Sequence, residues 1–453
     1  MDTDWNLIAT EWPYAGNPVL NTVRLTNVCM QRTIVPIYDR LASREASLAV
    51  IGLGYVGLDV AVGFARYFNV VGYDIDSDRV ENIRKKYGAD NCNIRFSSSM
   101  DDLAGASFYV ITVSTPVDDR KNPDLSPLLS ATRTVARYLN PGDYVVYEST
   151  VYPGCTEQVC VPQLEEVSGL KSGRDFKVGY SPERINPNDP LHSFENTFKV
   201  VSANDEEALE NISNVYAEVV RAGVYKASGI KVAEASKMTE NVQRNVNIAL
   251  MNELQRVFSH MGIDMSEVIE AASTKWNFAR YKPGLVGGHC ISVDPHYLVS
   301  EASRSGVDVP IISLSCAVND SMPAYVVRSA LEVLGPARNN PRALLMGVTY
   351  KQNTDDIRNT RAADVFRLLE KESVSVDAVD PYADPDKFYG MYGIRLLPVP
   401  QPPYDLIIVT VPHDGYVGLD EDYFRSISNG NALLADIGGL YKGRIKSLKY
   451  WSL

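Results

Sequence analysis

The stretch Leu48-Ala49-Val50-Ile51-Gly52-Leu53-Gly54-Tyr55-Val56-Gly57 decides the fold of this chain. Its apolar run predicts a short β-strand, and three glycines follow that strand directly. Residues 60–67 are then expected to form a helix and residues 70–74 a second strand. Strand, glycine-rich turn, helix and strand make a βαβ unit, the building block of a doubly wound α/β sheet.

The glycine turn has the dinucleotide-binding pattern in the structural context that this pattern requires. Gly52 allows a tight turn, Gly54 lets a pyrophosphate approach, and Gly57 permits close helix packing. The helix that follows points its N-terminus at the phosphates. Asp74 ends the second strand, where a carboxylate bonds ribose hydroxyls and repels a 2′-phosphate, so we expect NAD rather than NADP. The alternative interpretation is a glycine turn without a ligand.

Further strands are expected downstream at residues 108–113, 144–147 and 176–180. Each ends in small polar residues: Ser-Thr-Pro at 114–116, Glu-Ser-Thr at 148–150 and Ser-Pro-Glu at 181–183. Helical segments separate the strands, which indicates a parallel sheet. Ligands of such sheets bind beyond the carboxyl ends of the strands, so all three polar clusters should lie along the binding edge.

The rest of the chain extends this pattern into a second α/β unit. Residues 231–260 carry apolar side chains at helical spacing, without glycine or proline, and predict one long helix. Strands are expected again at 343–348, 374–379, 406–411 and 433–437, with a helix at 361–371. We therefore predict two Rossmann-like doubly wound domains joined by a long central helix and a helical middle domain. The expected boundaries are an extension at 1–46, a cofactor domain at 47–228, a central helical domain at 229–325 and a C-terminal domain at 326–453.

Composition excludes several classes of protein. The chain has 453 residues, a net charge of −12 and a pI of about 5.1, which argues against nucleic acid or an anionic membrane as partner. Six scattered cysteines form no disulfide framework and fit a reducing compartment. No apolar run approaches membrane-spanning length, and the first residues lack the features of a signal peptide. We expect a cytoplasmic protein.

The candidate reaction centre is the segment Gly-Gly-His-Cys-Ile-Ser-Val-Asp at residues 287–294. Backbone N–H groups beside Cys290 can hold its thiol as a thiolate, and Asp294 can hold a water or a proton donor. The alternative interpretation is a glycine turn with a buried structural cysteine. No Cys/His spacing here is typical of zinc, so no metal is expected. On the long helix, Lys237 and Asn241 share a face with Glu234, although solvated helix charges would give the same spacing.

Taken together, these motifs resemble the nucleotide-sugar 6-dehydrogenases of the UDP-glucose and GDP-mannose dehydrogenase superfamily. The likeness covers residues 48 to 440. Its markers are the glycine turn, the polar clusters at 114–116, 148–154 and 181–185, Lys237 with Asn241, the Gly-Gly-His-Cys loop, and Tyr350-Lys351 with Asp355, Asp356 and Arg358. The loop at 289–298 and the segment at 181–187 are similar to the branch that acts on UDP-N-acetylhexosamines.

This resemblance implies an NAD-dependent, four-electron oxidation at C6 of a UDP-N-acetylhexosamine, for surface polysaccharide synthesis. Cys290 would capture the aldehyde as a thiohemiacetal, which a second hydride transfer converts to a thioester that water hydrolyses. The implied catalytic residues are Cys290, Lys237, Asn241, Asp294, Thr150 and Glu183. The implied cofactor residues are Gly52, Gly54, Tyr55, Val56, Gly57, Asp74, Ser114, Thr115 and Thr150. The implied substrate residues are Glu183, Arg184, Lys237, Asn241, Gly287, Gly288 and Lys351.

Several questions stay open at the level of sequence. A homodimer through the long helix is expected from the length and apolar pattern of that helix. A UDP-glucose 6-dehydrogenase, a two-electron hydroxy-acid dehydrogenase and a non-catalytic nucleotide sensor are the alternatives. The sequence does not distinguish the gluco, manno and galacto forms of the hexosamine, and it assigns no role to the N-terminal extension.

Overall fold

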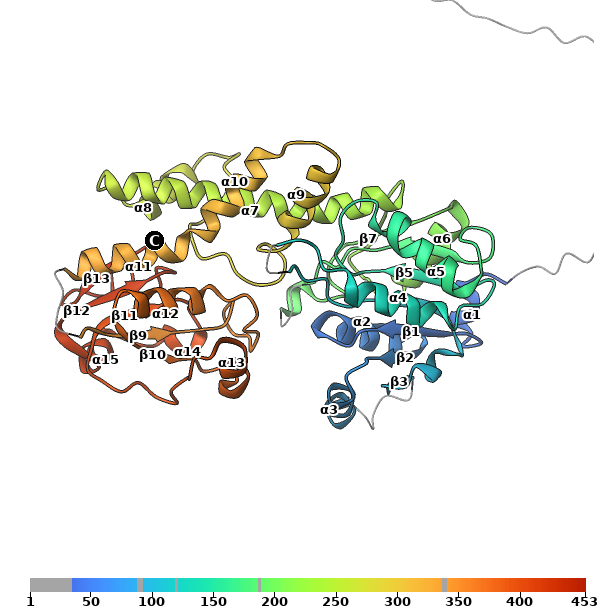
Figure 1. The fold of residues 1–453 in the computed structure, drawn as a ribbon, viewed down its shortest axis with the longest axis horizontal. Helices are drawn as coiled ribbons and strands as arrows, with labels where there is room; N and C mark the ends of the chain where they lie inside the picture. The colour runs from blue at the N-terminus through green and yellow to red at the C-terminus, as the bar shows by residue number, and fades with distance from the viewer. Residues whose placement is uncertain (1–34, 88–92, 119–120, 186–188, 336–339) are drawn as a thin grey trace, which may run out of the picture. The chain divides into compact units, whose positions relative to one another are not determined.

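The computed structural model describes residues 35–453 except 88–92, 119–120, 186–188 and 336–339 (Figure 1). Most of the N-terminal extension therefore lies outside the described residues. The described chain begins with α1 (Ile37–Ala42), a short helix that starts directly after Pro36. Ile37 and Leu41 of α1 are buried in the core beside the first sheet.

The first sheet has eight strands in the order β3-β2-β1-β4-β5-β6-β7-β8. The strands are β1 (Ser47–Ile51), β2 (Asn69–Tyr73), β3 (Ile94–Ser97), β4 (Ala106–Ile111), β5 (Tyr144–Tyr147), β6 (Lys177–Tyr180), β7 (Lys199–Ala203) and β8 (Val224–Lys226). All neighbours from β3 to β6 pair in parallel, which confirms the predicted parallel sheet. β7 then runs antiparallel to β6, a strand and a reversal that the sequence pattern did not predict.

Helices cover both faces of this sheet. One core lies beneath α2 (Tyr55–Ala65), α3 (Ser77–Tyr87) and α6 (Glu206–Ala217), and the other beneath α4 (Ser126–Ala136) and α5 (Val161–Ser168). The helix predicted over 60–67 is in fact α2, which starts five residues earlier and ends at Ala65. It starts there because Gly54 is already its N-cap, so the glycine turn leads into the helix without a linker.

The central part of the chain is helical, as predicted. The long helix α7 spans Ile230–His260, one residue longer than the predicted helix, and α8 (Met265–Ala272), α9 (Asp294–Arg304), α10 (Pro310–Asp320) and α11 (Met322–Leu334) follow it. The buried face of α7 is unusual because it is rich in polar side chains: Glu234, Lys237, Asn241, Asn245, Asn252 and Gln255. None of the helices within the described ranges is both long and apolar enough to cross a bilayer.

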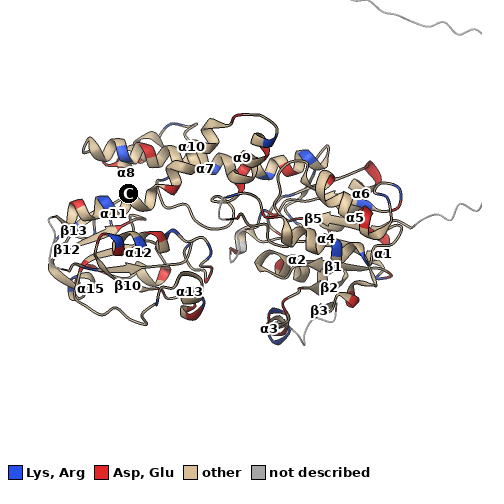
Figure 2. Ribbon diagram, viewed as in Figure 1, with Lys and Arg blue, Asp and Glu red and all other residues tan. Residues whose placement is uncertain are grey.

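The second sheet has five parallel strands in the order β10-β9-β11-β12-β13. They are β9 (Arg342–Met346), β10 (Ser375–Val379), β11 (Tyr404–Val409), β12 (Ser428–Asp436) and β13 (Lys449–Ser452). One face is covered by α11, α12 (Arg361–Lys371) and α13 (Pro385–Tyr392), and the other by α14 (Asp414–Val417) and α15 (Glu421–Ser426). Charged residues of both signs lie mainly on helices and connections (Figure 2). The fold is thus the predicted pair of Rossmann-like sheets with helices between them in the chain.

Candidate active site

The glycine turn after β1 is shaped for close approach. Gly52 has φ +96°, and a Cβ there would lie 2.9 Å from the Val113 side chain. A Cβ on Gly57 would lie 1.8 Å from the Gly52 carbonyl oxygen, so α2 packs on the turn only without a side chain. Gly54, by contrast, has open space where its Cβ would be. No described atom restricts position 54 to glycine by close contact, so this position is open to a pyrophosphate lying on the N-terminus of α2.

Asp74 lies at the end of β2, buried and close to this turn. Its carboxylate accepts hydrogen bonds from the backbone N–H groups of Leu53 (2.7 Å) and Asp76 (2.9 Å). Arg79 of α3 also donates to it, at 2.9 Å. The turn and Asp74 therefore have the arrangement that the adenosine half of NAD requires. Arg79 is a feature that sequence analysis missed, and it brings a cation to the ribose position.

Arg79 sharpens the prediction for cofactor choice. We expect Asp74→Ala to narrow the preference for NAD over NADP by about tenfold or more, because Arg79 is then released to meet a 2′-phosphate. The double variant Asp74→Ala/Arg79→Ala should not gain NADP activity, since it has lost both charges. The measurement is kcat/KM for each cofactor at fixed ionic strength. Equal efficiency of the unmodified enzyme with both cofactors would contradict the assigned role of Asp74.

The polar clusters at the strand ends take different positions. Thr115, in the loop after β4, donates from its hydroxyl to the Thr150 carbonyl (2.7 Å), which joins two of the expected cofactor residues. Ser114 is exposed beside it. Glu148, in contrast, is fully buried and bonds Lys199 at 2.7 Å and the Tyr216 hydroxyl at 2.5 Å. Glu148 therefore serves the structure of this edge of the sheet. Ser114, Thr115 and Thr150 stay the predicted cofactor residues there.

Helix α7 brings three predicted polar residues into the protein interior. Glu234 is completely buried and accepts from the backbone N–H groups of Gly154 (2.5 Å) and Thr156 (2.9 Å). It therefore ties the turn after Thr150 to α7. Lys237, one turn later, donates from Nζ to the Glu183 carbonyl at 2.6 Å and lies 3.8 Å from the Glu183 carboxylate. Solvated helix charges are excluded as the explanation, because Lys237 is only 5% exposed.

The Cys290 loop meets this face of α7. Asn241 donates from its side-chain amide to the Asp294 carboxylate at 2.5 Å. Asp294 begins α9, and its backbone N–H donates to the Cys290 carbonyl at 2.8 Å. A single hydrogen-bonded turn therefore separates Cys290 from Asp294. Among the cysteines of the described residues, Cys290 alone is exposed, whereas Cys155, Cys160 and Cys316 are buried.

The charges in this cluster are mutually dependent. The thiol of Cys290 reaches solvent, but the dense protein around it raises its pKa to about 12, and Asp294 adds to this rise while Lys237 opposes it. Burial raises the pKa of Asp294 to about 6, against the charge of Lys237 and the hydrogen bond from Asn241. Burial alone would lower the pKa of Lys237, but Glu183, Cys290 and Asp294 together raise it. Burial and Asp294 therefore favour the protonated thiol, whereas Lys237 favours the thiolate.

Segment 350–361 of the C-terminal half packs against the Cys290 loop and forms hydrogen bonds with its backbone. A Cβ on Gly288 would lie 2.6 Å from the Tyr350 ring, and the Gly288 N–H donates to the Asn359 carbonyl at 3.2 Å. His289 lies 3.2 Å from the Asp356 carboxylate, which Arg358 also pairs at 2.8 Å. Lys351 directly follows Tyr350 in this segment. Asn359 was missed by sequence reasoning, although an asparagine just before the N-cap Thr360 of α12 is a signal for a left-handed turn, and its φ is +50°.

Three of the expected residues have partners within the chain. Arg184 pairs with Glu240 and donates to the Phe198 carbonyl at 3.2 Å, so its guanidinium is used within the chain. The Tyr55 hydroxyl donates to Asp355 at 3.2 Å, which links the cofactor turn to segment 350–361. Val56 packs at the edge of the core beneath α2. The residues that the structure does bring together are Cys290, Asp294, Asn241, Lys237 and Glu183.

Three segments match one protein family in chain order. Residues 46–220 match the NAD binding domain of the UDP-glucose/GDP-mannose dehydrogenase family. Residues 231–321 match the central domain of that family, and residues 344–443 match its UDP binding domain.

Individual proteins are similar over almost their whole length. A UDP-N-acetyl-D-glucosamine 6-dehydrogenase of Pseudomonas aeruginosa is 42% identical over 410 residues, 87% of this chain and 97% of that protein. A protein of the same name from Salmonella typhi is 43% identical over 409 residues, 87% of this chain and 96% of that protein. A solved UDP-D-ManNAc dehydrogenase of Pyrococcus horikoshii has a TM-score of 0.80 at 29% identity, covering 90% of this chain and 98% of its own.

Proposed function

The chain belongs to the UDP-glucose/GDP-mannose dehydrogenase family, and on that premise we propose that it oxidises the C6 alcohol of a UDP-N-acetylhexosamine to the uronic acid. It is an NAD-dependent nucleotide-sugar 6-dehydrogenase. We favour the gluco epimer, because relatives named for UDP-N-acetyl-D-glucosamine are 42% and 43% identical to this chain, against 33% for a UDP-N-acetyl-D-mannosamine dehydrogenase of Pyrococcus horikoshii. The scattered cysteines support a cytoplasmic location as part of this proposal.

The proposed reaction consists of two oxidations and one hydrolysis. The C6 alcohol loses a hydride and a proton to become an aldehyde, and the Cys290 thiol adds to the aldehyde carbon to form a thiohemiacetal. Loss of a second hydride and proton gives a thioester, and water then releases the acid and restores the thiol. NAD, when bound at the glycine turn and Asp74, supplies the hydride acceptor, two molecules per substrate.

The observation that carries the proposal is the convergence of Lys237 and Asp294 on the one exposed thiol of the described residues. The Lys237 ammonium, which is itself buried, stabilises the oxyanion that develops when a thiol adds to an aldehyde. Asp294, ionised above about pH 6, accepts protons from the alcohol and later from the attacking water. Asn241 holds this carboxylate in place, and Glu183 with Thr150 positions the water.

A substrate panel tests this function. UDP-N-acetylglucosamine, UDP-N-acetylmannosamine, UDP-N-acetylgalactosamine and UDP-glucose are incubated with NAD, and NADH and the product mass are measured. We expect two NADH per substrate consumed and the fastest turnover with UDP-N-acetylglucosamine. Preference for UDP-glucose would move the enzyme to the other branch, and one NADH per substrate would indicate a two-electron dehydrogenase. Absence of turnover with every UDP-sugar would favour a sensor.

The raised pKa of Asp294 predicts the acidic limb of the pH profile. As pH falls through about 6, the carboxylate gains a proton and stops acting as a base, so kcat/KM should fall about tenfold per pH unit below that point. An unshifted aspartate would lose its charge only near pH 4. Asp294→Asn should lose most of the activity, and the remaining activity should no longer fall as the pH is lowered through about 6. Glu183→Gln is the control, and disappearance of the limb in that variant would assign it to Glu183 instead.

We further propose that the enzyme is a homodimer through the central helices. Large apolar side chains are exposed along and beyond α7, among them Leu250, Val257 and Met261, and Trp276 is 91% exposed. Exposed large apolar side chains on one helix are typical of a subunit interface. Leu250→Glu/Val257→Glu should therefore sediment as a monomer at micromolar concentration, while Val417→Glu, at an exposed site on α14, should not change the assembly. A fully active monomeric wild type would refute the proposal.

A further inference from the structure

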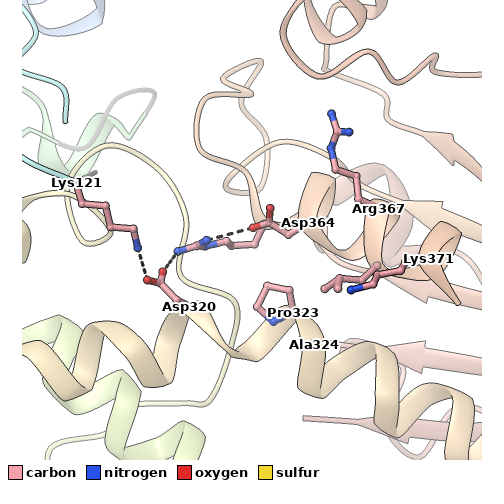
Figure 3. Close-up of a pocket in the computed structure, with 9 residues that line it drawn as sticks. Lys121, Asp320, Pro323, Ala324, Asp364, Arg367 and Lys371 are labelled. Carbon is pink, nitrogen blue, oxygen red and sulfur yellow. Dashed lines mark hydrogen bonds and ion pairs between the residues drawn. The ribbon is translucent and has the colours of Figure 1, made fainter. Parts of the chain in front are cut away.

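Lys121, Asp320 and Arg361 form a series of ion pairs. Figure 3 labels Lys121 and Asp320 and draws dashed lines at the Asp320 carboxylate. Asp320, the last residue of α10, bonds Lys121 through one carboxylate oxygen and Arg361 through the other. Lys121 lies in the loop that follows β4, which also carries Ser114 and Thr115. Arg361 is the first residue of α12, in the C-terminal half. One carboxylate therefore connects the cofactor-binding half, the central helices and the C-terminal half.

Arg361 also contacts the backbone of the Cys290 loop. Its Nε donates to the Val286 carbonyl at 2.8 Å, while Nη1 donates to Asp364 at 3.2 Å and Nη2 to Asp320. Each of the three guanidinium nitrogens thus has its own acceptor, and only the planar fork of arginine can serve all three in fixed directions. Val286 is buried and lies four residues before Cys290.

Residues next to Arg361 also hold the backbone of the Cys290 loop. Asn359 donates from its side-chain amide to the Gly288 carbonyl at 3.1 Å and accepts from the Gly288 N–H at 3.2 Å. A Cβ on Gly287 would lie only 2.7 Å from the Asn359 carbonyl oxygen. Segment 359–361 therefore holds the loop backbone at 286 and 288, just before the thiol.

The cofactor side reaches the same loop through α9. The Tyr297 hydroxyl, one turn after Asp294, donates to the Pro116 carbonyl at 3.1 Å. Lys121 bonds Asp320 from this same loop after β4. Tyr297 is thus one point at which the cofactor loop meets α9, the helix that begins with Asp294. Asp320 of α10 is a second point, and it is connected to the Cys290 loop through Arg361.

The exposure of these three side chains indicates that their ion pairs contribute more to the geometry of the site than to the stability of the fold. The side chains of Lys121, Asp320 and Arg361 are 45%, 30% and 21% exposed, and a cavity of about 540 Å³ opens beside them. Ion pairs that water can reach contribute little to folding. A displacement of about 1 Å at a reacting group, in contrast, can cost about 100-fold in rate.

We infer that Arg361 is a positioning residue for the Cys290 loop and that Asp320, through Lys121, aligns this loop with the cofactor-side loop. The inference rests on the proposed function, in which Cys290 adds to the aldehyde. Arg361 touches neither substrate nor cofactor in this account. It acts by fixing the carbonyl of Val286 and, through it, the path of the backbone to Cys290.

Three variants and one matched control test the inference. Arg361→Met removes every contact of the fork, and Arg361→Lys keeps a charge for Asp320 but no planar fork for Val286. Asp320→Asn keeps the Val286 bond and weakens both ion pairs. The control is Arg367→Met, since Arg367 lies on the same helix and lines the same cavity but donates to the Tyr392 carbonyl, away from the loop. For each variant we measure kcat, KM for NAD, melting temperature and hydrogen exchange of the peptide spanning 284–293.

We expect Arg361→Met to lower kcat roughly 10- to 100-fold with KM for NAD little changed, and to speed exchange of the loop peptide. Arg361→Lys should lower kcat almost as much as Arg361→Met does, and Asp320→Asn should lower it less. Arg367→Met should have the kcat and the loop exchange of the wild type. If Arg361→Met does not fold, Arg361→Lys decides by the same readouts. Wild-type kcat and loop exchange in the folded Arg361 variants would overturn the inference.

Failure of the inference is distinguishable from failure of the proposed function. Turnover by the wild type is measured first with the UDP-sugar panel. If the wild type turns over no UDP-sugar, the proposed function fails, and the exchange of peptide 284–293 still reports whether Arg361 orders the loop. If the wild type is active and the Arg361 variants equal Arg367→Met, only the inference fails.

Discussion

Replacing Cys290 by serine is expected to abolish net formation of the uronic acid. The serine hydroxyl is a poorer nucleophile than the thiol, and its ester would hydrolyse less readily than a thioester. The site makes the loss of rate larger. Burial and Asp294 already raise the pKa of the thiol to about 12, and a serine hydroxyl, as a weaker acid, would ionise even less readily. Loss of a catalytic nucleophile typically costs many orders of magnitude in kcat, so we expect at least a 1,000-fold fall, on the order of other nucleophile deletions.

Stoichiometry and trapping separate the covalent role from a structural one. The first oxidation does not need the thiol, so Cys290→Ser should yield at most one NADH per substrate and retain a tightly bound aldehyde. Acid quenching of the wild type during turnover should leave a hexosaminuronyl adduct on the peptide that contains Cys290. Cys316→Ser is the matched control, because Cys316 is buried and lies 3.6 Å from the Asn245 amide, as a structural cysteine does. Acid formation by Cys290→Ser at the wild-type rate would end the covalent mechanism.

Replacing Lys237 by methionine is expected to lower kcat about 100- to 1,000-fold, the cost of losing one preorganised oxyanion donor. Methionine keeps much of the side-chain volume but removes the only cation that lies within 4 Å of Glu183 among the described residues. Asp294 and Glu183 then both lose the positive charge that opposes the rise of their pKa values, so both carboxylates should hold protons to higher pH. Activity should therefore fall and its acidic limb should move to higher pH.

The control for Lys237 has to exclude a folding defect, because an unpaired buried charge is destabilising. Lys231→Met lies on the same helix, but Lys231 is 57% exposed and its amine is 3.9 Å from Glu157, so this variant should keep full activity. Lys237→Ala with added methylammonium provides a second check, since a small amine that fills the space should restore part of the rate only if the charge is what matters. Near wild-type kcat in a folded Lys237→Met would remove Lys237 from the mechanism.

Local pattern was sufficient for many elements of the fold, but it did not predict the strands β3, β7, β8 and β13. The helices predicted over 231–260 and 361–371 occur at Ile230–His260 and Arg361–Lys371, because neither run contains a glycine or proline to interrupt it. The parallel order of the first six strands follows from the glycine turn and the alternation of strands with helices. The early start of α2 was missed, because the pattern of apolar residues does not reveal that Gly54 is already the N-cap.

By itself, the sequence determined the two sheets, the cofactor turn and the residue types able to perform the chemistry. Tertiary structure alone decided which polar side chains face one another. Glu148 and Glu183 both follow strands of the first sheet, yet Glu148 is buried against Lys199 of β7, while Glu183 faces Lys237 of α7. Lys199 is brought there by the antiparallel return of β7 along β6, and Arg361 reaches Val286 across 75 residues of chain. Long-range packing determines such partners, because a buried charge requires an oppositely charged or hydrogen-bonding group beside it in space. That group lies far away in the sequence, so the local pattern does not reveal it.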